Sequence, residues 1–133
     1  MFGYDNVRSQ TVVISDPGAS GTYPIWKAPS RAAKVEILAA SAWVDTAIAG
    51  VGTAITLTLV DRGAKGTATA SAVASALGAT GTGDWTANVP RDFTISEGTL
   101  DGGDYLCVGY IESGTIAPKN ITVCFEWVNG VGA

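Results

Sequence analysis

Apolar and polar residues alternate in short runs along this chain of 133 residues, and no run keeps the helical period of about 3.6 residues through several turns. The clearest run is Ile55–Val60, in which Ile55, Leu57 and Leu59 fall on one side of an extended backbone and two threonines fall on the other. Such a strand has one buried face and one solvated face. The pattern predicts an all-β fold, a single antiparallel β-sandwich around one core.

Strand signals recur between turns that contain glycine or proline. Two short extended pieces, Thr11–Ser15 and Tyr23–Lys27, come first, and a long strand follows from Lys34 to Val44. Ala39 and Ala40 adjoin within this long strand, which indicates a bend or a bulge at that point.

A further extended segment covers residues 84–96 and is interrupted by Pro90. Proline has no N–H to donate to a ladder, so this segment is expected at a sheet edge or at a bulge. Phe93 and Ile95 alternate with polar residues, and Leu100 precedes a turn. We expect these three apolar side chains to be buried.

The last two strands, Tyr105–Glu112 and Lys119–Val128, are expected to form a hairpin around residues 113–118. In the register that matches their apolar positions, Val108 faces Val123. The face expected in the core then collects Leu106, Val108, Tyr110, Ile121, Val123, Phe125 and Trp127. The same register places the two cysteines opposite each other.

Two cysteines do not amount to a disulfide framework in a chain of this length. Cross-strand neighbours lie about 4.5–5.5 Å apart, so a bridge between Cys107 and Cys124 requires favourable geometry and an oxidising compartment. We expect both thiols to be reduced and to lie in or near the core.

The chain contains no histidine, which removes most acid–base, nucleophilic and zinc constellations. Eight basic and twelve acidic residues give a net charge of −4 with no basic run, which argues against nucleic acid as a partner. No apolar run reaches the length of a membrane span, and Met1–Asp5 lacks the features of a secretory signal, so neither a membrane partner nor a signal is expected. We expect no enzyme activity, no cofactor and no metal site.

Two motifs have both a binding interpretation and a structural one. Trp26 and Trp85 are candidates for a sugar-stacking platform, although packing in a core or an interface is the commoner role of tryptophan. The run Asp101–Asp104, together with Asp84, offers carboxylates to calcium. It lacks the alternating spacing of a calcium loop, so we interpret it as a solvated turn.

From Ala33 to Val128 the order of segments resembles the head decoration (cement) proteins of tailed bacteriophages. The resemblance is carried by the long strand, the run ITLTLVDRGAKGT at residues 55–67, the strand FTIS at 93–96, the Gly-Asp turn at 103–104 and the final hairpin. It implies a jelly-roll-like sandwich. It also implies a strand at Ala72–Leu77, although the alanines there favour helix.

The resemblance further implies a non-enzymatic virion protein that is made in the host cytoplasm and binds the outside of an assembled capsid. Its partners would be the major capsid protein and, commonly, two further copies in a homotrimer. Two other functions stay open. One is a glycan- or receptor-binding module of a tail fibre or spike, and the other is a minor tail structural protein.

Residues 1–31 lie outside the resemblance, so we expect an N-terminal arm with the first short strands at 1–31 and the sandwich domain at 32–133. Aromatic anchors dominate interface energetics, which favours four residues of this arm for binding the capsid or a neighbouring subunit. These residues are Phe2, Tyr4, Tyr23 and Trp26. For Tyr23 and Trp26 the alternative is that they cover one open end of the core.

Overall fold

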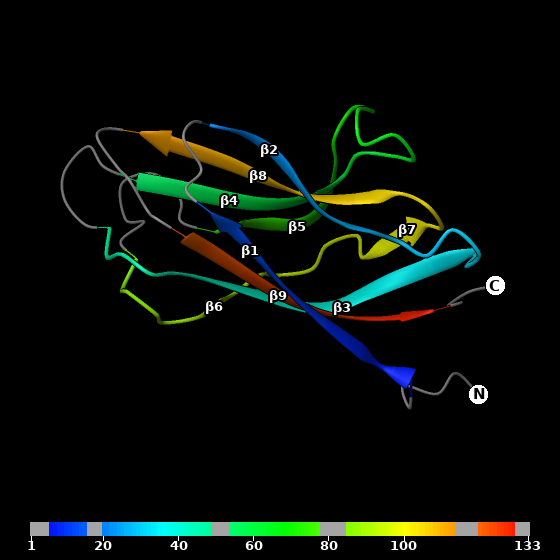
Figure 1. Ribbon diagram of the computed structural model, residues 1–133, viewed down its shortest axis with the longest axis horizontal. Helices are drawn as coiled ribbons and strands as arrows, with labels where there is room; N and C mark the ends of the chain where they lie inside the picture. Colours follow the sequence, from blue (N-terminus) through cyan, green and yellow to red (C-terminus); the bar gives the residue numbers. More distant parts are fainter. Residues whose placement is uncertain (1–5, 16–19, 49–53, 78–84, 114–119, 130–133) are drawn as a thin grey trace.

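The computed structural model describes residues 6–15, 20–48, 54–77, 85–113 and 120–129. Within these ranges the chain forms two antiparallel sheets packed face to face (Figure 1). The strands are β1 Arg8–Ser15, β2 Gly21–Lys27, β3 Lys34–Val44, β4 Ala54–Asp61, β5 Ser71–Leu77, β6 Arg91–Asp92, β7 Thr99–Asp101, β8 Tyr105–Ser113 and β9 Asn120–Asn129.

The strand order identifies the architecture. One sheet, called sheet A here, has the order β1-β9-β3-β6, with β7 also paired to β3, and the other, sheet B, has the order β2-β8-β4-β5. Strands that follow each other in the chain therefore lie in opposite sheets in most cases, as with β1 and β2 or β8 and β9. This is the arrangement of a jelly roll. The prediction of an all-β antiparallel sandwich of jelly-roll type is confirmed.

One core lies between the sheets. The predicted inward face of β4 is fully buried and consists of Ile55, Leu57 and Leu59. On β3, Ile37 and Ala40 both face the core because the register with β9 shifts between Ile37 and Ala39. The predicted irregularity in this long strand is thus a bulge. The strand expected in the alanine-rich stretch is also present, as β5.

The predicted hairpin of the last two strands is wrong. β8 pairs with β2 and β4, whereas β9 pairs with β1 and β3 in the other sheet. The assignment of faces is right, since all the predicted core residues of these strands are buried: Leu106, Val108, Tyr110, Ile121, Val123, Phe125 and Trp127. Two strands that face each other across a sandwich alternate in the same way as two strands that pair, so the pattern does not distinguish them.

The two cysteines lie in different sheets. Cys107 pairs with Pro24 in sheet B, and Cys124 pairs with Thr11 in sheet A. Sheets packed face to face are about 10 Å apart, which excludes a bridge between these two residues. Both thiols are free; Cys107 is buried and Cys124 is half-buried.

The first 31 residues contribute one strand to each sheet. β1 pairs with β9 along all eight of its residues. β2 pairs with β8 and has a bulge between Pro24 and Trp26. Both are edge strands, so the described part of the segment expected as an arm is integrated in the sandwich.

The segment after Pro90 lies at a sheet edge, as predicted. β6 is two residues long and pairs with β3 at the edge of sheet A. Phe93 and Leu100 are buried, while Ile95 is half-buried and packs against the core. Ile95 also forms a bridge to Ala74 of β5, so this segment connects the edges of the two sheets on one side of the sandwich.

Candidate docking surfaces

Three aromatic rings join the edge strand β2 to β9 of the opposite sheet. The ring of Trp26 lies 5.2 Å from that of Phe125 and 4.9 Å from that of Trp127, measured between centroids. The guanidinium of Arg8 lies 5.7 Å from the centre of the Trp127 ring. Because of the bulge after Pro24, Trp26 faces the core together with Leu106, its partner on β8. Trp26 is half-buried and covers this side of the core.

Tyr23 packs in a similar way on the same strand. Its ring lies edge-on to Tyr110 at a centroid distance of 6.3 Å. Tyr110 is buried and its hydroxyl donates a 2.8 Å hydrogen bond to Oε2 of Glu112. Burial and then the Glu112 carboxylate raise the pKa of Tyr110 well above its ordinary value, so the hydroxyl stays neutral and keeps donating.

The four predicted docking residues thus divide into two groups. Phe2 and Tyr4 lie outside the described residues. Tyr23 and Trp26 are half-buried and pack against the core, which is the alternative role expected for them. Their use in docking stays a prediction.

Trp85 is not a sugar platform. It is 1% exposed, its backbone exchanges two hydrogen bonds with Ile48, and its indole Nε1 donates to the carbonyl of Ile55 at 3.3 Å. The guanidinium of Arg91 stacks 4.8 Å from the ring centre. Trp85 therefore has the core-packing role that was given as the commoner alternative, and of the two candidate platforms only the half-buried Trp26 reaches the surface.

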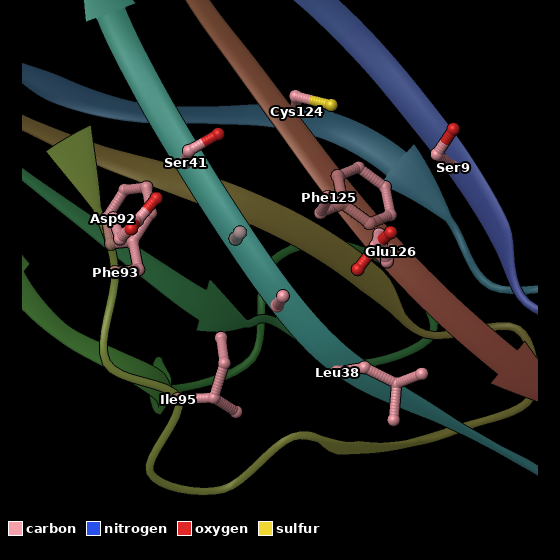
Figure 2. A pocket seen from close by; sticks show the side chains of 11 residues that line it. Ser9, Leu38, Ser41, Asp92, Phe93, Ile95, Cys124, Phe125 and Glu126 are labelled. Atoms are coloured by element: carbon pink, nitrogen blue, oxygen red, sulfur yellow. The ribbon is translucent and has the colours of Figure 1, made fainter. Parts of the chain in front are cut away.

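The outer face of sheet A holds a depression of about 690 Å³ (Figure 2). Small side chains on adjacent strands contribute to its lining, with Ser9 on β1, Cys124 on β9 and Ser41 on β3. Carboxylates of Asp92 and Glu126 contribute to its lining. Apolar side chains, among them Leu38 and Ile95, complete the lining, so the depression combines shape with apolar and hydrogen-bonding groups. Sequence reasoning missed it, although the small residues on alternate positions are visible in the sequence.

Three carboxylates meet at the end of sheet B beside the start of β8. Asp61 accepts a 2.9 Å hydrogen bond from the backbone N–H of Gly63, and its carboxyl group shares a hydrogen bond with Asp104. Asp101 forms an exposed 2.9 Å ion pair with Lys34. Burial, followed by the hydrogen bond and the charge of Asp61, raises the pKa of Asp104 to about 6. The described part of this turn accordingly behaves as one proton-sharing pair with a surface ion pair beside it.

We expect acidification from pH 7.5 to pH 5 to stabilise the fold through this pair. The pKa of Asp104 is raised in the folded state, so its contribution to stability is fully present below its ordinary value of 3.8 and is lost as the pH rises through about 6. Thermal unfolding of Asp104→Asn should be less sensitive to pH over this interval than that of the parent chain. Asp92→Asn, an exposed carboxylate in the other sheet, serves as the control. Equal pH dependence of Asp104→Asn and the parent would contradict the assignment.

The described ranges contain no group of three or more histidine, cysteine, aspartate or glutamate residues arranged to hold a metal ion. The same ranges contain no helix with the length and hydropathy of a membrane span.

The jelly-roll fold is shared with one chain of a solved phage capsid structure. A chain of the structure described as the cyanophage Pam1 capsid asymmetric unit is similar over 92% of this chain and 84% of that chain, with a TM-score of 0.56 and 17% identity. A chain of the structure described as infectious bursal disease virus Gt strain aligns over 97% of this chain and 35% of that chain, with a TM-score of 0.41 and 10% identity. No family model and no curated protein matches the sequence. The first similarity establishes a common fold that extends over most of both chains.

Proposed function

We propose that this chain is a non-enzymatic virion structural protein, a decoration protein that binds the outside of an assembled phage capsid and stabilises it. The observation that carries this proposal is the fold similarity to a chain of a phage capsid asymmetric unit, which extends over most of both chains. The sequence resemblance to head decoration proteins supports the same role independently.

The surface chemistry fits attachment to a shell. The described residues offer an open depression on the outer face of sheet A and half-buried aromatic residues on β2. A net charge of −4 helps to keep the free chain in solution before it meets a capsid. Many modest contacts repeated over a symmetric shell produce durable attachment through multivalency. The major capsid protein is accordingly the proposed partner, and the outer surface of the virion the proposed location.

Assembly as a homotrimer is an expectation of the sequence resemblance alone. A decoration protein gains avidity from any closed oligomer whose copies contact the shell together. The proposed role therefore does not depend on the number of copies.

We expect the double substitution Phe2→Ala and Tyr4→Ala to weaken binding to capsids about tenfold or more, because these are two aromatic side chains ahead of β1 and aromatic anchors carry much of an interface's energy. The measurement is co-sedimentation with purified capsids that lack the chain. Ile111→Ala is the matched control, since Ile111 is 60% exposed on the outer face of sheet B. If the parent chain stays in the supernatant, the proposed function is wrong. If the parent sediments and the double variant sediments equally well, only the docking role of Phe2 and Tyr4 is wrong.

A further inference from the structure

The edge strand β1 has features of a strand that pairs with another chain. Among the described residues β1 pairs with β9 alone, so its second edge has no partner there. Figure 1 shows β1 crossing in front of β9, and β1 is the terminal strand of sheet A. Its eight residues contain no proline, no bulge and no charge after Arg8. Natural edge strands usually carry at least one such feature, because an unprotected edge is a template for pairing.

The other edges are protected. β2 contains Pro24 and a bulge directly after it. β5 has two register shifts. Its outer edge is covered at Val73 by the segment that contains Ser96 and Glu97, whose N–H groups donate hydrogen bonds to the carbonyl of Val73. β6 and β7, which both pair with β3 at the other edge of sheet A, are two and three residues long and too short to add a strand of useful length. Within the described sandwich, β1 is thus the edge best suited to pairing.

The hydrogen bonds next to β1 determine which of its backbone groups are free. Asp45 donates its N–H to the carbonyl of Asn120, so the backbone of Asn120 points toward β3. Backbone groups of successive strand residues point in opposite directions, so Ile121 points toward β1 and pairs there with Ile14. The N–H groups of Phe93 and Asn88 bond to the carbonyls of Ala40 and Val44, so the backbone of these two β3 residues points away from β9. This agrees with the directions assigned to the backbone of β9. The residues of β1 that point to the free edge are therefore Ser9, Thr11, Val13 and Ser15.

We propose that β1 pairs antiparallel with β1 of a second copy of this chain, about a two-fold axis at Val12. In this register Ser9 faces Ser15 and Thr11 faces Val13. Every residue of β1 whose backbone groups point to the free edge then forms hydrogen bonds in both copies. Val12 then faces its own equivalent as a close, non-hydrogen-bonded pair. Residues 9–15 carry no charge, so the two-fold contact brings no like charges together.

The exposure of side chains along β1 agrees with a second copy of β1 as its partner. The side chain of Val13 is 52% exposed, and those of Ser9, Thr11 and Ser15 are also exposed. The side chain of Val12 is only half-buried, although it is on the face of β1 that lies toward the core. A second β1 covers both groups and extends sheet A across the two copies. The pairing is two-fold, so it predicts a dimer and differs from the homotrimer that the sequence resemblance implies.

Cross-linking tests the register. In a chain with Cys107→Ala and Cys124→Ser, we expect Val12→Cys to form a disulfide-linked dimer on mild oxidation, because non-hydrogen-bonded pairs bring Cα atoms to about 4.5 Å. Gln10→Cys is the matched control. It lies on the same face but opposite Ile14, and the two copies of residue 10 are about 13 Å apart at about 3.3 Å per residue. No cross-link at Val12, or equal cross-linking at both positions, overturns the proposal.

A second variant tests the pairing without cysteines. Val13→Pro removes an N–H that points to the free edge, so the sandwich keeps its internal hydrogen bonds while the dimer contact is lost. Sedimentation equilibrium should give a dimer for the parent chain and a monomer with unchanged circular dichroism for Val13→Pro. A monomeric or trimeric parent, or a dimer that survives Val13→Pro, overturns the proposal. None of these readouts involves a capsid, so they are independent of the proposed function.

Discussion

Trp85→Ala should lower the free energy of unfolding by about 3–5 kcal/mol, the range found when a large buried aromatic side chain is truncated. Trp85 is 1% exposed, and its indole N–H bonds to the carbonyl of Ile55 on the central strand β4. Truncation leaves a cavity, loses that hydrogen bond and removes the ring on which Arg91 stacks. Denaturant unfolding followed by fluorescence and circular dichroism measures the change.

Trp43→Ala is the matched control for this prediction. Trp43 lies on β3 with its side chain on the outer face of sheet A, half-buried and opposite Thr122. Cross-strand side-chain pairs of this kind contribute about 0.2–1 kcal/mol, so the loss should be small. If the two tryptophan variants are equally stable, Trp85 does not anchor the core as described.

Gly102→Ala should destabilise the fold by about 3 kcal/mol, at the upper end for overpacking. An added Cβ at residue 102 overlaps the carbonyl oxygen of Ala32 and lies 3.0 Å from that of Pro29. Both obstacles are backbone atoms, and the surrounding turn is held by hydrogen bonds from Gly102 N–H to Ala33 and from Gly103 N–H to Ala28. Since backbone cannot move aside as a flexible side chain does, the turn that leads into β8 must distort.

Gly21→Ala is the control for Gly102→Ala, because a Cβ there meets only the ring of Tyr23 at 3.8 Å. This change should alter stability by about 0.5 kcal/mol or less. The midpoint of urea unfolding distinguishes the two variants. A Gly102→Ala protein as stable as Gly21→Ala would contradict the close approach between residue 102 and the segment that follows β2.

The sequence was sufficient to assign faces and insufficient to assign partners. Alternation along β4 and the last two strands identified the buried side chains, because burial repeats every second residue whichever strand lies alongside. The hairpin of β8 and β9 was wrong for the same reason, since the inward pattern is equal for strands that pair and strands that face each other. Only long-range contacts, which local patterns do not encode, decide between these two arrangements.

The candidate site was predictable to a smaller degree. Trp85 is flanked by polar residues and glycines, so its sequence neighbours indicate a loop, yet hydrogen bonds to Ile48 and Ile55 hold it inside the sandwich. Trp26 faces the core because of the bulge after Pro24, and a proline in a strand is compatible with a plain sheet edge as well as with a bulge. The depression on sheet A depends on small side chains from three strands that are adjacent only after folding.

The most direct test of the proposed role is the number of chain copies bound per capsid as the concentration of free chain is raised. The capsids are shells of the proposed partner, the major capsid protein, prepared without this chain, and the unassembled capsid protein is titrated in parallel. A decoration protein saturates at a fixed number of copies per shell and does not bind the unassembled subunits. Absence of binding to shells, or binding that rises without a plateau, would contradict the account.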